Sequence, residues 1–346
     1  MVGIDGRDRW INGAAAAPCA VPGPDPPFRH GDFHGMVGRS AAMQRVYAQV
    51  TRVAAGGAPV LIVGETGTGK ELIARAIHDA SPRRSGPFVA VNCAALPREL
   101  IESELFGYRR GAFSGAMSDH PGLIRAAAGG TVLLDEVTEM SPELQAKLLR
   151  VLQEHTVRPI GSVTEVAADV RFIGSTNRDL HQALRDGLLR PDLYYRLAVG
   201  VVSVPALRER NDDIALLVEH YLGVLHQRYS DTTPSPRGIA VDALHALAQH
   251  AWPGNVRELF NVLEHAFTVS TAPCIRGTDL VELVTPRAPT AAVDDTAAGA
   301  LATYADSERA LIQHTLARAG GNKTRAAQQL GISRKKLYAR IAKYAL

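Results

Sequence analysis

The sequence contains few cysteines and few aromatic residues, and it has no long apolar run. Aromatic residues make up 5% of the 346 residues. No stretch approaches the roughly 20 consecutive apolar residues of a membrane helix, and the N-terminus lacks the basic and apolar segments of an export signal, so we expect a cytoplasmic protein. The cysteines show neither a CxxC pair nor a histidine at metal-ligand spacing, and we expect reduced, structural thiols. They are Cys19, Cys93 and Cys274.

The positive charge of the chain is concentrated near its C-terminus. The formal net charge of +3 is too small over the whole chain to identify a partner. Residues 320–346, however, contain seven Lys or Arg and no Asp or Glu. With 46% hydrophobic residues, the chain has enough apolar surface for a sizeable core and suits two or three domains better than one.

Composition and periodicity divide the chain into five segments. Residues 1–34 are rich in Gly, Pro and Ala, without a helical or strand period, and predict a flexible tail. Residues 35–207 alternate short apolar runs with helical patterns, which predicts an α/β subdomain with a mainly parallel sheet. Residues 208–284 are helical without a convincing strand, and a linker at 285–300 precedes a helical domain at 301–346. The expected strands are at 60–63, 88–91, 131–134, 170–174 and 199–204.

A glycine-rich segment has the context of a phosphate-binding loop, or P-loop. It follows an apolar run at 59–63 and precedes a helix with one apolar face. The glycines let backbone N–H groups turn toward phosphate oxygens, while the helix N-terminus and Lys70 supply positive charge. Glu71 stands where a Ser or Thr usually helps to hold Mg²⁺, so the metal depends more on other groups and on water. The predicted nucleotide-binding residues are Gly64, Glu65, Thr66, Gly67, Thr68, Gly69, Lys70 and Glu71.

Two adjacent carboxylates end the apolar run that begins at Thr131. In isolation, Asp135 and Glu136 would fit an ordinary acidic turn. At this distance after a P-loop, Asp135 is predicted to hold Mg²⁺ through water, and Glu136 to polarise the attacking water. Asn177 ends another predicted strand and is expected to orient the γ-phosphate or that water. These residues predict ATP hydrolysis.

At these motifs the sequence resembles the sigma-54-dependent activators, a bacterial family of the AAA+ class. The resemblance covers residues 35–284 and includes the P-loop spelling GETGTGKE, in which Glu71 is the family's usual residue. It implies an AAA+ P-loop parallel sheet with a helical lid, ATP and Mg²⁺ as cofactors, and a homo-oligomeric ring, which in this family is a hexamer.

The resemblance also assigns roles to four residues outside the P-loop. Asn92 matches the residue that restrains the catalytic Glu until the ring senses its target. Arg190 and Arg196 match arginines that reach a neighbouring subunit's nucleotide, and Arg257, in Trp-Pro-Gly-Asn-Val-Arg, matches the second-sensor residue of the lid. Without these surrounding motifs, each arginine would suggest a surface salt bridge. A guanidinium from the next subunit stabilises the charge of a phosphoryl-transfer transition state, so activity is expected to require a ring.

A short loop resembles the GAFTGA loop by which this family grips sigma-54. An exposed Phe113 between small residues has no evident core to fill, and the motif Glu-Ser-Glu-Leu-Phe-Gly precedes the loop. Ser114 stands where Thr is usual, which keeps the hydroxyl but loses the methyl group that stiffens the side chain. The alternative is an ordinary glycine-rich surface loop. The predicted sigma-54 contacts are Gly111, Ala112, Phe113, Ser114, Gly115 and Ala116.

The C-terminal segment has helix-turn-helix spacing. Asn322 and Ser333 are suited to cap two helices, and Gly331 suits the turn between them. Leu337 and Ile341 belong to the expected buried side, which leaves basic residues facing outward toward a DNA major groove. The segment resembles a Fis-type domain, which implies a dimer and a palindromic enhancer; a solvated basic helix is the alternative. The predicted DNA contacts are Lys323, Arg325, Arg334, Lys335, Lys336 and Arg340.

Members of this family often begin with a phosphate-accepting or ligand-sensing domain, whereas only a short tail precedes the ATPase motifs of this sequence. We therefore expect control by an inhibitory partner protein, or by regulated expression, rather than by phosphorylation in cis. Two other functions stay open: a DNA-binding regulator with the ATPase fold that acts without sigma-54, and a ring-shaped protein unfoldase. Intact Phe113 and Glu136 argue against the first, and the DNA-binding segment argues against the second.

Overall fold

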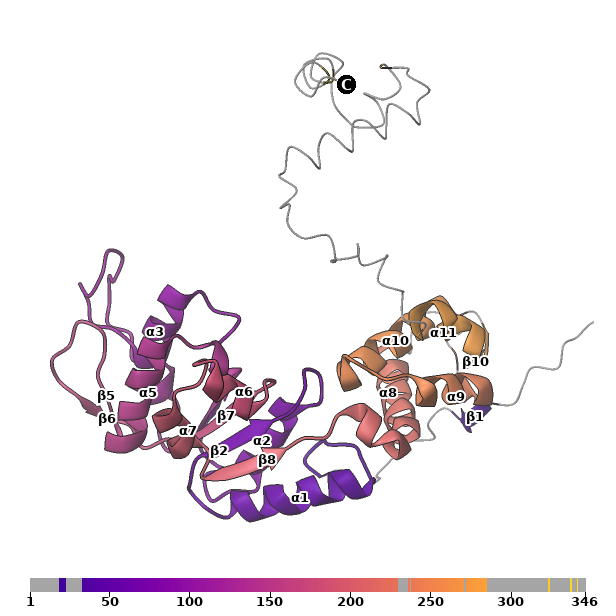
Figure 1. The fold of residues 1–346 in the computed structure, drawn as a ribbon, viewed down its shortest axis with the longest axis horizontal. Coiled ribbons are helices and arrows are strands. Elements are labelled where there is room, and N and C mark those ends of the chain that lie inside the picture. Colours follow the sequence, from indigo (N-terminus) through magenta and orange to yellow (C-terminus); the bar gives the residue numbers. More distant parts are fainter. Residues whose placement is uncertain are drawn as a thin grey trace, which may run out of the picture. The chain divides into compact units, whose positions relative to one another are not determined.

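The computed structural model describes residues 19–22, 33–229, 236, 238–270 and 272–284, together with residues 323, 337 and 341. The chain forms two compact units, Met1–Thr285 and Pro286–Leu346. Figure 1 shows the helices and strands of the first unit. Within the described part of the chain, no helix is both long and apolar enough to cross a membrane.

A five-stranded parallel sheet forms the centre of the first unit. Its strand order is β3-β4-β7-β2-β8, and every neighbouring pair is parallel. The expected mainly parallel sheet is thus confirmed, because the five apolar runs all became strands. They are β2 (Val60–Val63), β3 (Phe88–Asn92), β4 (Thr131–Asp135), β7 (Arg171–Thr176) and β8 (Gly200–Ser203).

Helices cover both faces of this sheet (Figure 1). Side chains alternate along a strand, so Val132 and Leu134 enter one core, while Leu133 enters the other. The first core packs against α3 (Arg98–Phe106), α4 (Leu123–Ala126), α5 (Pro142–Glu154), α6 (Leu180–Arg185) and α7 (Pro191–Leu197). The second core packs against α1 (Ala41–Ala54) and α2 (Lys70–Asp79). Each buried aliphatic side chain contributes about 1.5–3 kcal/mol, so the two cores hold the strand ends in fixed positions.

Local capping residues explain where several helices begin. The Ser40 side chain accepts a hydrogen bond from the N of Met43 and caps α1. Ser141 caps α5 in the same way, and Pro142 occupies the first turn, where no N–H is needed. Asp179 caps α6 by accepting from the N of Gln182 at 2.8 Å.

A helical lid follows the sheet and has its own core around the fully buried Trp252. Its helices are α8 (Ile214–Tyr229), α9 (Val241–Gln249), α10 (Asn255–Val269) and α11 (Gly277–Val284). The lid also contains the short strands β9 (Gly238–Ala240) and β10 (Cys274–Ile275), which pair in parallel. The expectation that this segment has no strand was therefore wrong, because strands of two or three residues are too short to show a period of two.

The N-terminal segment also contains a strand that the sequence analysis did not predict. β1 (Cys19–Pro22) pairs antiparallel with β9, so these four residues are not part of a structureless tail. Cys274, in the same small sheet, is disulfide-bonded, which corrects the expectation that all cysteines are reduced. Strand pairing brings together segments that are far apart in sequence, and spacing along the chain does not reveal it. Cys93 is a free, buried thiol, as expected.

Three residues of the second unit are described. Lys323, Leu337 and Ile341 are helical; Lys323 is exposed, and the other two are buried. This distribution agrees with the predicted outward and inward sides of the helix-turn-helix segment. The expected caps and turn at Asn322, Gly331 and Ser333 lie outside the described residues.

Candidate functional site

The P-loop lies between β2 and α2. Gly69 has a φ of 100°, a left-handed conformation that suits glycine, and it directly precedes Lys70, the first residue of α2. Lys70 is 7% exposed, and its Nζ donates to Gly64 O at 3.0 Å and to Glu65 O at 3.4 Å. The Thr68 hydroxyl donates to Glu65 O at 2.8 Å. The loop therefore holds its lysine ammonium at the N-terminus of a helix, the arrangement expected for phosphate binding.

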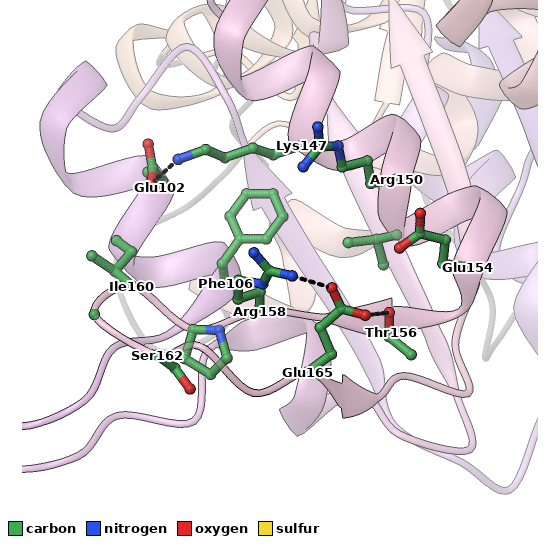
Figure 2. A pocket seen from close by; sticks show the side chains of 13 residues that line it. Glu102, Phe106, Lys147, Arg150, Glu154, Thr156, Arg158, Ile160, Ser162 and Glu165 are labelled. Carbon is green, nitrogen blue, oxygen red and sulfur yellow. Dashed lines mark hydrogen bonds and ion pairs between the residues drawn. The ribbon is translucent and has the colours of Figure 1, made fainter.

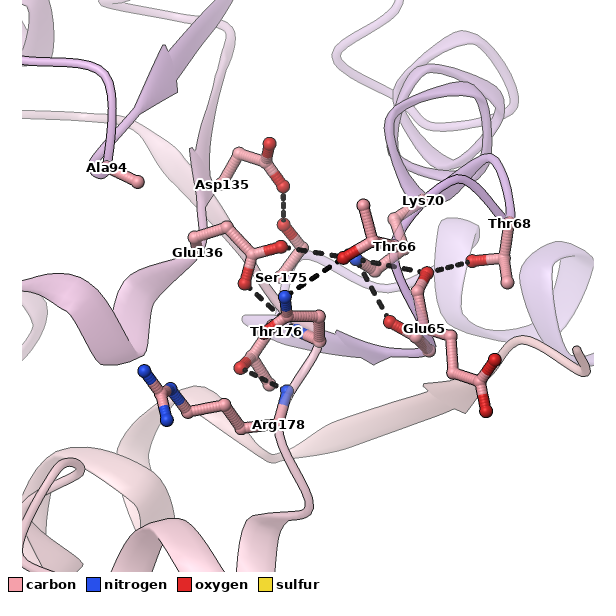
Figure 3. Close-up of polar contacts among 12 residues, drawn as sticks. Glu65, Thr66, Thr68, Lys70, Ala94, Asp135, Glu136, Ser175, Thr176 and Arg178 are labelled. Carbon is pink, nitrogen blue, oxygen red and sulfur yellow. Dashed lines mark hydrogen bonds and ion pairs between the residues drawn. The ribbon is translucent and has the colours of Figure 1, made fainter. Parts of the chain in front are cut away.

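The two adjacent carboxylates lie at the end of β4, directly opposite the P-loop lysine (Figure 3). Glu136 Oε1 lies 3.3 Å from Lys70 Nζ, and Glu136 Oε2 accepts a hydrogen bond from Asn177 N at 2.9 Å. The backbone of Glu136 is left-handed, with a φ of 57°. For a residue other than glycine this conformation costs on the order of 1–3 kcal/mol, and such strain concentrates at functional sites.

Asp135 is held by neutral donors from two neighbouring strands. Ser175 Oγ donates to Asp135 Oδ1, and Asn92 Nδ2 donates to Asp135 Oδ2 at 3.3 Å. The Asn92 amide therefore contacts Asp135 in this structure, whereas the resemblance implied a contact with Glu136. The register explains this difference, because Asn92 and Asp135 are direct partners across β3 and β4. The contact of Ser175 with Asp135 was not predicted. The sequence feature that could have indicated it is the position of Ser175 near the end of β7, the strand that pairs with β4.

These groups open into one cavity of about 470 Å³ between the P-loop, the strand ends and the lid. The amide of Asn177 also reaches the P-loop, where Nδ2 donates to Thr66 Oγ1 at 3.0 Å. Most of the residues predicted from separate motifs thus line a single space. The lining residues are Thr66, Gly67, Gly69, Lys70, Glu71, Leu72, Asn92, Asp135, Glu136, Asn177, Val256 and Arg257.

A second, narrower cavity of about 120 Å³ adjoins the first and was missed by the sequence analysis. It shares Gly69, Leu72 and Val256 with the first cavity. Its other residues come from α1 and the segment before it, from the P-loop and α2, and from the lid, and most of them are apolar. They include Met36, Val37, Met43, Ile73, Leu217 and Phe260. Scattered apolar residues carry no motif, so only the folded chain reveals such a slot.

Arg190 and Arg196 are absent from the residues that line the nucleotide cavity in the described part of the chain. Arg190 pairs with Asp192, with Nη2 and Oδ2 2.8 Å apart, and Arg196 donates from Nη2 to Leu152 O at 3.3 Å. The Asp192 carboxylate raises the pKa of Arg190, mainly through this hydrogen bond. The segment that contains Arg190 and Arg196 therefore contributes no arginine to the described cavity.

The segment at 111–116 forms a turn that presents Phe113. Gly111 N donates to Ala116 O at 2.9 Å, and both Gly111 and Gly115 have positive φ angles. The Phe113 side chain is 46% exposed and packs edge-on against Tyr108, with ring centroids 4.9 Å apart. Ser114 is exposed, whereas Ala116 is buried. The loop therefore has a fixed base and an accessible aromatic tip.

A hairpin of β5 (Thr156–Val157) and β6 (Val166–Ala167) supports the base of this loop. Arg109 N donates to Ile160 O, and Ile160 N donates to Gly107 O. Beneath the hairpin, a pocket contains the ion pairs Lys147–Glu102 and Arg158–Glu165 (Figure 2). Lys147 is on α5 and Glu102 is on α3, so the first pair links the helix that precedes the loop to the helix that follows the two adjacent carboxylates.

Comparison with known protein families explains this combination of features. A model of the sigma-54 interaction domain matches residues 36–203, one of the AAA+ ATPase lid domain matches residues 208–297, and one of the Fis family of bacterial regulatory proteins matches residues 303–344. The transcriptional regulatory protein GlrR from Escherichia coli K12 is 44% identical over 319 residues, which cover 90% of this chain and 68% of GlrR. The chain belongs to the sigma-54-dependent transcriptional activators.

Two further comparisons agree with this membership. The regulator ZraR from Salmonella typhimurium LT2 is 42% identical over 311 residues, which cover 89% of this activator and 68% of ZraR. The crystal structure of NtrX from Brucella abortus in complex with ATP has a TM-score of 0.66 and 35% identity, and covers 90% of this activator and 70% of NtrX. The activator is therefore an AAA+ ATPase that regulates transcription through sigma-54 and binds DNA, rather than a sigma-54-independent regulator or an unfoldase.

Of the predicted DNA contacts of this activator, Lys323 alone lies within the described residues, where it is helical and exposed. Arg325, Arg334, Lys335, Lys336 and Arg340 lie outside the described residues. The Fis-family match at 303–344 includes all six positions. Their individual contacts with DNA stay predictions.

Proposed function

We propose that this activator binds ATP with Mg²⁺ between the P-loop and the lid, and hydrolyses it in a homo-oligomeric ring to remodel sigma-54 RNA polymerase. The observation that carries the proposal is the convergence of Lys70, Glu136, Asn177 and Arg257 on one cavity of about 470 Å³. The adjoining apolar slot suits the adenine base, and NtrX, which has a similar structure, was crystallised with ATP.

Each of these side chains has a separate task in hydrolysis. Lys70 and Arg257 stabilise the negative charge that develops on the phosphate oxygens. Glu136 accepts the proton of the attacking water, and Asn177 orients that water or the γ-phosphate. Glu136 is now held by Lys70 and by Asn177 N, so binding of the phosphates to Lys70 must loosen one of its two contacts.

The donor set also fits a magnesium ion. Asp135 accepts hydrogen bonds from neutral groups and has no ion pair among the described residues, so its charge is available to a divalent cation. Asp135 would hold the metal through water, and Glu71, which lines the same cavity, replaces the usual hydroxyl. Bound magnesium would neutralise charge on the phosphate oxygens.

Arg190 and Arg196 support a ring because, in the described part of the chain, neither lines the nucleotide cavity. An arginine that lies outside its own cavity contributes to catalysis only where a neighbour's nucleotide comes within reach. We infer that these two guanidinium groups complete the neighbouring site, and that hydrolysis in the ring moves the loop at 111–116 against sigma-54.

The experiment that tests this output loop is Phe113→Ala. The loop contains no group that binds phosphate or activates water, so the variant should hydrolyse ATP and bind DNA nearly as the wild type does. It should fail to open a sigma-54 promoter in a single-round transcription assay, because the exposed aromatic anchor is lost. Wild-type promoter opening by Phe113→Ala would rule out this loop as the output element.

DNA recognition is assigned to the second unit. Removal of residues 301–346 should abolish enhancer protection in a footprinting assay and leave concentration-dependent ATP hydrolysis, because the catalytic residues all lie in the first unit. A truncated protein that protects the same site would contradict this assignment.

A further inference from the structure

The fully buried amide of Asn255 joins segments that are far apart in the sequence. Asn255 is the first residue of α10 and has a left-handed φ of 53°. Its Oδ1 accepts a hydrogen bond from Leu207 N at 2.7 Å. Its Nδ2 donates to Glu65 Oε2 at 3.1 Å and to Thr66 O at 3.0 Å. One side chain therefore ties together the P-loop, the segment that enters the lid, and the lid.

The Glu65 carboxylate completes this connection. Arg208 donates to it through two nitrogens, with Nη1–Oε2 at 2.8 Å and Nη2–Oε1 at 2.5 Å. Donation from Arg208, and then from Asn255, lowers the pKa of Glu65 to about 2. Glu65 is also absent from the residues that line the nucleotide cavity in the described chain. Its charge therefore serves the contact with the lid, whereas the sequence analysis placed it with the nucleotide ligands.

Backbone contacts run beside these side chains. Val256 N donates to Gly67 O at 3.0 Å, and Arg257 N donates to the same oxygen at 3.3 Å. A Cβ on Gly67 would lie 2.2 Å from Gly254 O, so the P-loop and the lid are in direct backbone contact. The next side chains along α10 are Val256 and Arg257, and both line the nucleotide cavity. A small shift at Asn255 would therefore move Arg257 directly.

We propose that Asn255 and Glu65 are positioning residues for ATP hydrolysis: they fix the lid against the P-loop, so that Arg257 reaches the phosphates. The lid packs around its own core at Trp252, to which this polar contact adds no apolar side chain. The contact instead sets the placement of the lid relative to the loop that holds the phosphates. This inference rests on the proposed function, in which Arg257 is a phosphate ligand.

The direct test is Asn255→Asp in the full-length protein. Aspartate has nearly the same size and tolerates a left-handed backbone, but it places an oxygen where Nδ2 now donates to Glu65 and Thr66. We expect kcat for ATP hydrolysis to fall about 10- to 100-fold, the usual range for one lost transition-state contact. Wild-type kcat and KM in a folded Asn255→Asp protein would overturn the proposal.

A double-mutant cycle separates positioning from a general loss of structure. If Asn255 acts through Arg257, then adding Asn255→Asp to Arg257→Ala should lower kcat by less than about twofold. If the double variant instead shows the product of the two separate reductions in kcat, Asn255 does not act through Arg257. If Arg257→Ala alone hydrolyses ATP normally, the proposed function is wrong at Arg257. If Arg257→Ala hydrolyses ATP slowly while Asn255→Asp hydrolyses it at the wild-type rate, only the positioning role is rejected.

Complementary and control substitutions complete the experiment. Glu65→Gln supplies an amide that can donate to the oxygen introduced by Asn255→Asp, so it should restore part of the kcat that Asn255→Asp loses; a purely structural defect would not be rescued. If Asn255→Asp does not fold, Glu65→Ala removes the same contact at the Glu65 carboxylate. It should likewise have little further effect on kcat in the Arg257→Ala background.

Glu264→Gln is the matched control, because Glu264 on α10 accepts hydrogen bonds from Tyr221, Arg228 and Tyr229 within the lid. It should alter thermal stability and leave kcat unchanged.

Discussion

At the scale of single residues, Glu136 is held by a contact with Lys70 for which a bound nucleotide's phosphates would compete. Its two oxygens are occupied by Lys70 Nζ and Asn177 N, and its backbone is left-handed. Phosphate oxygens compete directly with Glu136 for the ammonium of Lys70. In the proposed function, nucleotide binding therefore frees Glu136 from its contact with Lys70.

The two partners of this ion pair should therefore have different defects. Lys70→Ala removes the charge that holds the phosphates, so ATP binding should weaken. Glu136→Gln keeps the size of the side chain and removes the base, so ATP should bind while turnover falls about 10²- to 10⁴-fold. Measuring ATP affinity and steady-state hydrolysis for both variants distinguishes the roles. Normal turnover of Glu136→Gln would show that another group is the base.

Cys93 offers a prediction from its pKa. The thiol is 5% exposed, and burial, together with the charges of Asp135 and Glu136, raises its pKa to about 12. At pH 8 only about one thiol in ten thousand is ionised, and the thiolate is the reactive form. Iodoacetamide at pH 8 should leave Cys93 unmodified in the folded protein and modify it after denaturation, as followed by mass spectrometry. Rapid labelling of the native protein would contradict the buried position.

At the scale of elements, strand ends and turns determine what the sheet presents. The five strands of the central sheet were predictable because each coincides with a short apolar or β-branched run between helical patterns. β1, β9 and β10 were not predictable, because they lie in segments whose composition indicates a tail or helices, and they form by pairing between distant parts of the chain. The same reason applies to Ser175 and Asn255. Each lies beside a pattern that is visible in the sequence, but its hydrogen-bond partners lie on other elements.

The loop at 111–116 leads to a prediction for Ser114, where the family usually has Thr. Ser114→Thr restores one methyl group and should keep sigma-54 promoter opening or strengthen the polymerase contact by at most about fourfold, as for one buried CH₂. Ser114→Ala removes the hydroxyl and should weaken the contact about 2- to 10-fold. ATP turnover serves as the control, because the exposed Ser114 is outside the nucleotide cavity. A large change in turnover for either variant would show that the loop also acts on the chemical step.

At the scale of the whole molecule, the proposed function makes the site of a single subunit incomplete. The first unit brings together the P-loop, both carboxylates, Asn177 and Arg257, while Arg190 and Arg196 lie outside that cavity. Sequence motifs identified these arginines, but the spacing of residues in one chain does not show which nucleotide they approach. A guanidinium supplied by a neighbour contributes about 10³- to 10⁵-fold to phosphoryl transfer, so assembly itself should control turnover.

Mixing two inactive variants tests this division of the site. Arg196→Ala subunits keep a complete cavity but no longer offer Arg196 to the neighbour, and Glu136→Gln subunits lack the base but still offer Arg196. Each variant alone should hydrolyse ATP about 10²-fold or more below wild type. In a mixture, an Arg196→Ala subunit next to a Glu136→Gln subunit regains both groups at one interface. ATP turnover should therefore rise above the sum of the separate samples and depend on the mixing ratio. A mixture that only averages the two activities would place Arg196 in its own subunit's site or outside catalysis.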